Sequence, residues 1–317
     1  MQINYCLILA AGLGTRMGKI GQALPKVLWP VYEKSLLELQ VAYARSLGAE
    51  KIYINLHYMS DEVFDFCKGK SAFDNVEFLL EKPEVLDIGG AVHNLAAQPS
   101  VNYTGNLLVL NADQFFYIKP EVMEKYLSLF PDAPSVLFSY FVETDLGYNA
   151  LDINNRREVV GIIKNADLPK GSRVETYTGI SYINLQKLSV VKGPSGFFES
   201  VCPFKEKKIP AISLENVDYW DFGTVKRYWE TMFRLLKTYS INSNHPFIRF
   251  LVNEKALKTW KINFLKSSYN STIEKVINLA PESSSIDLGP AIILASTTAS
   301  KKKGNTIFWK NISEEVI

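Results

Sequence analysis

Residues 9–31, LAAGLGTRMGKIGQALPKVLWPV, form the stretch that decides the fold. An apolar run, YCLIL, leads into this stretch and predicts a buried first strand. A Gly-x-Gly turn follows at Gly12 and Gly14, then Arg16 and, ten residues later, Lys26. Small residues let backbone N–H groups approach an anion closely, and the two cations add fixed positive charge. The pattern therefore predicts a loop that binds the phosphates of a nucleotide.

Spacing separates this loop from two better-known glycine loops. A dinucleotide-binding fingerprint needs a small residue five positions after its first glycine, but Met17 stands there. A P-loop needs Gly-Lys followed by Ser or Thr, whereas Gly18-Lys19 is followed by Ile20. A plain glycine turn with two solvated cations is the alternative. The length of the combined strand, loop, arginine and lysine pattern favours phosphate binding.

Composition excludes several classes of function. The chain has 317 residues, is 47% hydrophobic, and suits one large domain with an extension. Its net charge is +2 without a basic stripe among aromatic residues, so no nucleic-acid partner is expected. Three scattered cysteines without a C-x-x-C argue against disulfides and zinc. No apolar run approaches ~18 residues and no signal-peptide pattern is present, so we expect a cytoplasmic protein without membrane contact.

Strand-like and helix-like patterns alternate over the first 111 residues. Strands are predicted at residues 5–9, 51–55, 76–80 and 106–111, and helices after caps at Ser35 and Ser60 and over residues 90–97. This alternation predicts an α/β fold with a doubly wound, mainly parallel, Rossmann-like sheet that binds ligands at the carboxyl ends of its strands. Further strands at 135–142, 158–163 and 178–183 are expected to be antiparallel and to form the wall of a second half-site.

We place a domain boundary after an amphipathic helix at residues 224–239, which gives a catalytic domain at 1–238 and an extension at 239–317. The extension reads as helical and then as short β runs, with a hint of hexapeptide β-helix rungs but no clear repeat. It lacks candidate phosphate or metal ligands and carries apolar runs. We therefore expect it to be dispensable for chemistry but to matter for assembly, as a homo-oligomer, or for solubility.

Two carboxylates lie in distinctive positions in the sequence. Asp113 follows the buried strand at 106–111, and an aspartate at a strand's carboxyl end facing the phosphate loop is well placed to hold Mg²⁺. Asp221 lies in the string YWDFGT, ahead of Thr224, which can cap the next helix. Simple turn or helix capping is the alternative role for both aspartates.

The opening string, Asp113 and YWDFGT together resemble the sugar-1-phosphate nucleotidyltransferases (NDP-sugar pyrophosphorylases) over about residues 1–238. The sequence looks most like the small bacterial members that act on N-acetylmuramate 1-phosphate or mannose 1-phosphate. The resemblance implies that an NTP and a sugar 1-phosphate give an NDP-sugar and pyrophosphate, for synthesis or recycling of glycan precursors. It implies catalytic roles for Arg16, Lys26, Asp113 and Asp221, Mg²⁺ held by the two aspartates, and UTP or GTP as the favoured donor.

The resemblance also implies a set of binding residues. Nucleotide contacts are expected from Ala10, Ala11, Gly12, Gly14, Thr15, Arg16, Lys26, Asp87, Gly89, Gly90 and Asp113, and sugar-phosphate contacts from Asn55, Gly179 and Lys164. The chain departs from the family at Gly18, where many relatives have arginine, and at Ile88, where threonine is usual. It also departs beside Lys164, where the neighbours Ile163 and Asn165 favour a solvated lysine, and a turn role is the alternative for Asn55. A nucleotidyltransferase for a non-sugar phosphate such as phosphocholine, and a non-catalytic nucleotide-binding regulator, stay open as alternatives.

Overall fold

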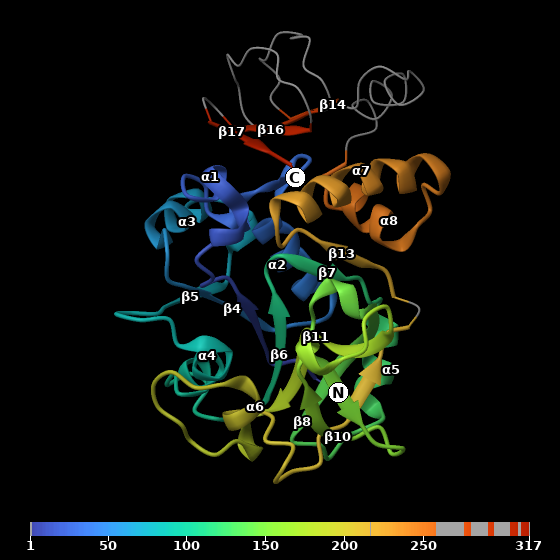
Figure 1. Cartoon of the computed structure of the whole chain (residues 1–317). Helices are drawn as coiled ribbons and strands as arrows, with labels where there is room; N and C mark the ends of the chain where they lie inside the picture. The colour runs from blue at the N-terminus through green and yellow to red at the C-terminus, as the bar shows by residue number, and fades with distance from the viewer. Residues whose placement is uncertain are drawn as a thin grey trace.

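The computed structural model describes residues 2–215, 217–257, 276–279, 291–294, 305–309 and 312–316. Its centre is a seven-stranded sheet with the order β12-β8-β11-β6-β1-β4-β5 (Figure 1). The strands are β1 (Tyr5–Leu9), β4 (Lys51–Leu56), β5 (Val76–Leu80), β6 (Asn106–Asn111), β8 (Ser135–Glu143), β11 (Arg173–Asn184) and β12 (Ala211–Ser213). Strands β6, β1, β4 and β5 are parallel, and β11 is antiparallel to both β6 and β8. The predicted α/β fold with a mainly parallel sheet is confirmed.

Both faces of the sheet are buried, as the uniformly apolar strands require. Successive residues of β1 show this directly, because Cys6 and Ile8 join one hydrophobic core and Leu7 joins another. The helices are α1 (Gly18–Gly21), α2 (Leu36–Ser46), α3 (Ser60–Cys67), α4 (Asp87–Ala96), α5 (Pro120–Ser128), α6 (Phe197–Ser200), α7 (Val225–Ile241) and α8 (Pro246–Asn253). Buried residues of α2, α7 and α8 belong to the first core, and those of α4 and α6 to the second. The sheet is therefore doubly wound.

Helix starts agree with the sequence at α2 and α7 but not at α3. Ser35 accepts a hydrogen bond from the Glu38 backbone (3.1 Å), and Glu38 accepts one from the Ser35 backbone (2.8 Å), which completes the expected capping box. Thr224 caps α7 as expected. Ser60, predicted as the cap of α3, is its first residue instead; Met59 precedes it in a left-handed conformation and makes no side-chain cap.

Two of the later strands differ from the expectation in extent or partner. The expected strand at 158–163 is β10 (Val159–Ile163), which pairs with β9 (Ala150–Ile153) in a separate ribbon. The strand expected at 178–183 is part of the longer β11, whose register shifts between Tyr177 and Ser181. A second ribbon pairs β7 (Gln114–Phe116) with β13 (Tyr219–Asp221) and so brings the two halves of the chain together. Among the described residues, no helix has the length and apolar character to cross a membrane.

The C-terminal strands form a sheet of their own. The strands β14 (Val276–Asn278), β15 (Ala291–Ile293) and β16 (Thr306–Trp309) are parallel, and β17 (Ile312–Glu315) is antiparallel to β16. The register pairs Val276 with Ala291 and Ala291 with Thr306, an interval of 15 residues in each case. Parallel strands at a constant interval are typical of a solenoid repeat, which the sequence did not reveal. Ile292 and Ile307 are buried in the first core.

Helix α8 belongs to the core of the preceding unit. Phe247 and Leu251 are fully buried, and the Phe247 ring stacks on Trp220 with a centroid distance of 5.3 Å. The backbone N–H of Glu33 donates to the carbonyl of Ala256 (3.0 Å), so the chain just after α8 is hydrogen-bonded to the N-terminal part of the molecule. The boundary at residue 238 stays a prediction. These contacts favour a catalytic unit that continues to residue 257.

We expect Phe247→Ala to lower the free energy of unfolding by about 3–5 kcal/mol, because it removes a fully buried aromatic ring and leaves a cavity. Urea unfolding followed by circular dichroism measures the change. Ile241→Ala is the matched control: this side chain is 76% exposed, and its loss should change stability by less than about 0.5 kcal/mol. Equal effects from the two substitutions would show that α8 is not part of the core.

Candidate active site

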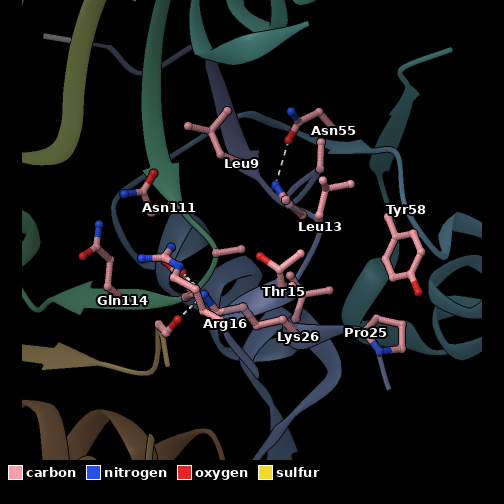
Figure 2. Close-up of a pocket in the computed structure, with 18 of the residues that line it drawn as sticks. Leu9, Leu13, Thr15, Arg16, Pro25, Lys26, Asn55, Tyr58, Asn111 and Gln114 are labelled. Atoms are coloured by element: carbon pink, nitrogen blue, oxygen red, sulfur yellow. Dashed lines mark hydrogen bonds and ion pairs between the residues drawn. The ribbon is translucent and has the colours of Figure 1, made fainter. Parts of the chain in front are cut away.

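A cavity of about 480 Å³ opens at the carboxyl ends of β1, β4 and β6. Most of the predicted site residues line it: Ala10, Ala11, Gly12, Gly14, Thr15, Arg16, Lys26, Asn55, Asp87, Asp113 and Asp221. Figure 2 shows Thr15, Arg16 and Lys26 in the middle of the view, with Asn111 and Gln114 on one side and Tyr58 and Pro25 on the other. The topology therefore brings the glycine loop and both aspartates to one site, as parallel strands do at their carboxyl edge.

The glycine loop is shaped by backbone conformations that glycine favours. Gly14 has a φ of 65° in the left-handed region, and its carbonyl accepts a hydrogen bond from Met17 (2.9 Å). Gly18 combines a φ of 60° with a ψ of −153°, a region essentially restricted to glycine. Met17 and Ile20 are fully buried and anchor the loop in the core. Gly18 is thus required by the turn, which gives a structural reason for the absence of a side chain at this position.

Asn55, in β4, forms hydrogen bonds that connect the start of the glycine loop to the chain after the neighbouring strand β5. Its Oδ1 accepts a hydrogen bond from the backbone N–H of Ala10 (2.7 Å), and its Nδ2 donates to Oε1 of Glu81 (2.7 Å). Glu81 is 1% exposed, and its other oxygen accepts from the backbone of Leu86 (2.9 Å), ahead of α4. Asn55 therefore positions three segments of the cavity wall. Sequence reasoning missed Glu81, although a lone carboxylate directly after the strand at 76–80 was a usable signal.

Asp113 and Asp221 meet beside Gly223. Asp113 forms an ion pair with Lys26, whose ammonium also donates to the carbonyl of Gly223 (2.9 Å). A Cβ at residue 223 would lie 2.8 Å from Oδ1 of Asp221 and 3.5 Å from Oδ2 of Asp113. Glycine at this position keeps open the space that the two carboxylates share. The arrangement gathers charge of both signs from three separate segments.

Protein donors hold the Asp221 carboxylate. Its Oδ2 accepts from the Tyr219 hydroxyl (2.6 Å) and from Nη1 of Arg227 (2.8 Å), and its Oδ1 accepts from the Gly223 backbone (2.7 Å). Burial raises the pKa of Tyr219, and the charge of Asp221 raises it further, so this hydroxyl stays protonated and donates. Oδ1 is the oxygen beside Gly223, and a Cβ at that residue would lie near both Oδ1 and the Asp113 carboxylate. Asp221 is therefore fixed in orientation before any ligand binds.

Sequence reasoning missed further residues of the cavity wall, among them Gln114, Tyr148 and Arg227. Arg227 lies in the first turn of α7, where its backbone N–H donates to the Thr224 side chain (3.2 Å). Its guanidinium lies over the Tyr148 ring, with 5.2 Å between Cζ and the ring centroid, and Nη1 also donates to the Tyr148 hydroxyl. A cation one turn after a predicted helix cap was a signal in the sequence. The sequence contained no signal that the Arg227 side chain points into the cavity.

Four predicted site residues do not line the cavity. Gly89 and Gly90 pack against residues 193–200, because a Cβ on Gly89 would lie 2.6 Å from the Gly196 carbonyl. Gly179, with a φ of 83°, lies behind Asn111, whose Nδ2 would be 2.0 Å from a Cβ there. Lys164 is exposed and outside the wall. The ligand contacts expected of these four residues stay predictions, whereas close packing gives the three glycines a structural role.

A glycine loop at the end of β1, with two carboxylates at the same edge of a doubly wound sheet, is the arrangement that the sequence resemblance predicts for a nucleotidyltransferase. Comparison with known proteins agrees, since residues 6–144 match the family described as the MobA-like NTP transferase domain. The chain is 31% identical over 188 residues to the bifunctional protein GlmU of Synechococcus sp. (strain RCC307), covering 58% of this chain and 40% of that protein. The family resemblance expected from the sequence is confirmed, and the chain is a homologue of sugar-1-phosphate nucleotidyltransferases.

Other proteins are similar to this chain in sequence or in fold. A bifunctional sugar-1-phosphate nucleotidylyltransferase/acetyltransferase of Sulfurisphaera tokodaii is 23% identical over 225 residues, covering 68% of this chain and 51% of that protein. HddC from Yersinia pseudotuberculosis has a TM-score of 0.59 at 21% identity, covering 73% of this chain and 99% of the other. A UDP-glucose pyrophosphorylase complexed with UDP-glucose has a TM-score of 0.60 at 18% identity, covering 75% and 100%. These structures share the fold, and the chain spans about half or less of the curated relatives' length.

We expect Asn55→Ala to lower the free energy of unfolding by about 2–3 kcal/mol, because it leaves the Ala10 N–H and the buried Glu81 carboxylate without their partner. Chemical denaturation measures the loss. Asn155→Ala changes an exposed turn asparagine in the same way and should leave stability nearly unchanged. If Asn55→Ala proved as stable as this control, the hydrogen bonds of Asn55 to the loop and to Glu81 would not contribute to the stability of the fold.

Proposed function

We propose that this protein transfers a nucleotidyl group from an NTP, with UTP or GTP favoured, to a sugar 1-phosphate and releases pyrophosphate. The single observation that carries the proposal is the convergence of the glycine loop, Lys26, Asp113 and Asp221 on one cavity. Homology to sugar-1-phosphate nucleotidyltransferases supports this choice among phosphate acceptors. The soluble cytoplasmic setting and the homo-oligomer expected from the sequence are part of the same proposal.

The distribution of side chains in the cavity supports this reaction. Exposed apolar side chains, Leu13, Tyr58 and Val85, line the part formed by the loops after β1, β4 and β5, and suit a flat nucleobase. Polar and charged groups line the part near Asp113 and Asp221, which suits phosphates and a sugar. A cavity of about 480 Å³ lies within the range of small-molecule and cofactor sites.

The reaction needs positioning and charge neutralisation rather than a general base. The acceptor's phosphate oxygen is already anionic; it forms a bond to the α-phosphorus while the bond to the bridging oxygen breaks and pyrophosphate leaves with the electron pair. The backbone N–H groups of residues 12–15, together with Arg16 and Lys26, hold the donor phosphates in line for this attack. The three histidines, all in the described part of the chain, are not among the lining residues, which is consistent with such a mechanism.

The residues present fit a magnesium ion. Arg16, Lys26 and Arg227 face four lining carboxylates, those of Glu81, Asp87, Asp113 and Asp221, so the wall itself has no excess positive charge for a triphosphate. Asp113 and Asp221 offer oxygen ligands to the space that Gly223 leaves open, and Mg²⁺ usually takes one or two carboxylates together with phosphates and water. When bound, the ion would neutralise charge on the phosphates and polarise the α-phosphate.

Pyrophosphate release tests the proposed function. Purified protein is incubated with Mg²⁺, each common NTP, and a panel of sugar 1-phosphates with phosphocholine as the competing acceptor. We expect release with UTP or GTP and at least one sugar 1-phosphate. Release with phosphocholine alone would assign a different acceptor class. Thermal stabilisation by NTPs without any release would indicate a non-catalytic nucleotide-binding regulator.

We expect Asp113→Asn and Asp221→Asn each to lower turnover by on the order of 10²-fold or more, because each removes a fixed charge beside the reacting phosphate. NTP affinity should fall less, since the loop, Arg16 and Lys26 remain. Mn²⁺ should restore part of the activity if metal occupancy is the defect. Asp167→Asn, at an exposed position outside the cavity wall, is the control. Lower melting temperatures with near-normal turnover in both site variants would show that these aspartates only cap turns and do not act in catalysis.

A further inference from the structure

We propose that Arg227 forms the subsite for the phosphate group of the acceptor substrate. The inference rests on the proposed function and assigns to Arg227 the contact that the family resemblance assigned to Lys164. A sugar 1-phosphate carries close to two negative charges at neutral pH and needs a cation within hydrogen-bonding reach. Lys164 is exposed and lies outside the cavity, whereas Arg227 is part of its wall.

The direction of the reaction places the acceptor on the side of the cavity where Arg227 lies. In-line transfer requires the acceptor oxygen to approach the α-phosphorus from the side opposite the leaving pyrophosphate. The loop after β1, with Arg16 and Lys26, occupies the donor side. The lining residues outside that loop include those after β6, Tyr148, and the segment from Asp221 to Arg227, and Arg227 is the cation that they contribute.

The guanidinium of Arg227 is held in place by its neighbours. It pairs with Asp221 at 2.8 Å, lies over the Tyr148 ring, and donates to the Tyr148 hydroxyl. Both of these hydrogen bonds use Nη1, so Nη2 and Nε are not needed for them. An arginine side chain presents five N–H donors in a rigid fork that matches phosphate geometry. A side chain that is 27% exposed, fixed on one edge and turned into a cavity can bind a phosphate with little loss of conformational entropy.

The contact with Asp221 suggests a second role for Arg227, which is to position the Asp221 carboxylate without binding the acceptor. If the arginine only holds the carboxylate, its loss should act on turnover through Asp221 and should leave acceptor affinity unchanged. If it binds the acceptor phosphate, its loss should act mainly on the KM of the acceptor. The split between kcat and the two KM values therefore separates the two roles.

The experiment compares Arg227→Gln and Arg227→Lys with the unmodified protein. Glucose 1-phosphate and N-acetylglucosamine 1-phosphate are the acceptor probes. We expect Arg227→Gln to raise the acceptor KM by about 10- to 100-fold, the scale of one charged hydrogen-bonded contact, and to change the NTP KM by less than about threefold. Arg227→Lys keeps the charge but loses the fork, and should raise the acceptor KM by about 3- to 10-fold.

Three further variants complete the comparison. Arg156→Gln makes the same change at an exposed arginine outside the cavity and should leave all constants unchanged. Lys164→Gln tests the rival assignment and should not raise the acceptor KM. Tyr148→Phe keeps the ring under the guanidinium but removes one hydrogen bond, and should raise the acceptor KM less than Arg227→Gln does. Melting temperatures of all variants identify any loss of folding.

Isothermal titration with the same two sugar phosphates, in the presence of a non-hydrolysable NTP, gives a readout independent of turnover. An acceptor affinity that is unchanged in both Arg227 variants overturns the subsite, as does a KM increase found for Lys164→Gln instead. Arg227-dependent binding without pyrophosphate release from the unmodified protein supports the subsite and contradicts the proposed function. If the unmodified protein shows no acceptor binding and no pyrophosphate release, both the subsite and the proposed function are contradicted.

Discussion

The ion pair between Lys26 and Asp113 is the interaction on which the site depends. Lys26 belongs to the segment after the glycine loop and Asp113 follows β6, while the Lys26 ammonium also donates to the Gly223 carbonyl ahead of α7. One ammonium group therefore joins three segments that lie almost two hundred residues apart at their extremes. The two side chains are 12% and 25% exposed, so removing one partner would leave a largely buried charge uncompensated. The same groups are the ones that we propose to face the triphosphate of the donor.

Close approach of backbone to carboxylate and amide groups is the second constraint. Gly223 lies so near Asp221 and Asp113 that any Cβ would enter the space between them, and Gly179 lies against Asn111 in a left-handed conformation. These two glycines act from positions far along the chain, yet both shape the edge of the sheet where β6 ends. Gly89 and Gly90 serve packing of α4 on the 193–200 segment, which positions Asp87 at the cavity without placing the glycines themselves in its wall.

The charge pattern of the cavity connects the fold to the proposed chemistry. Lys26 is paired with Asp113 and Arg227 with Asp221, so each aspartate of the site already has a fixed cation beside it. Preorganised charges of this kind stabilise a transition state without reorganisation during the reaction. The two pairs meet beside Gly223, because a Cβ at that residue would lie 2.8 Å from Oδ1 of Asp221 and 3.7 Å from the Lys26 ammonium. The C-terminal strands contribute to the same core through Ile292 and Ile307.

The sequence by itself determined the parts of this protein that depend on local pattern. Apolar strands predict a sheet buried on both faces, the capping box at Ser35 predicts where α2 begins, and the spacing from Gly12 to Lys26 predicts the phosphate loop. Asp113 could be found because it follows a buried strand, and Asp221 because the string YWDFGT resembles one in the sugar-1-phosphate nucleotidyltransferases. The strand interval at β14, β15 and β16 was missed because apolar residues recur there without a distinctive motif.

Only the tertiary structure decided the features that depend on contacts between side chains from distant segments of the chain. No local signal tells that Asn55 bridges Ala10 and Glu81 or that Arg227 pairs with Asp221. The place of α8 in the core was likewise fixed by ring packing of Phe247 on Trp220. Hydrogen bonds and close packing act over a few ångströms in space, whereas sequence patterns report only neighbours along the chain.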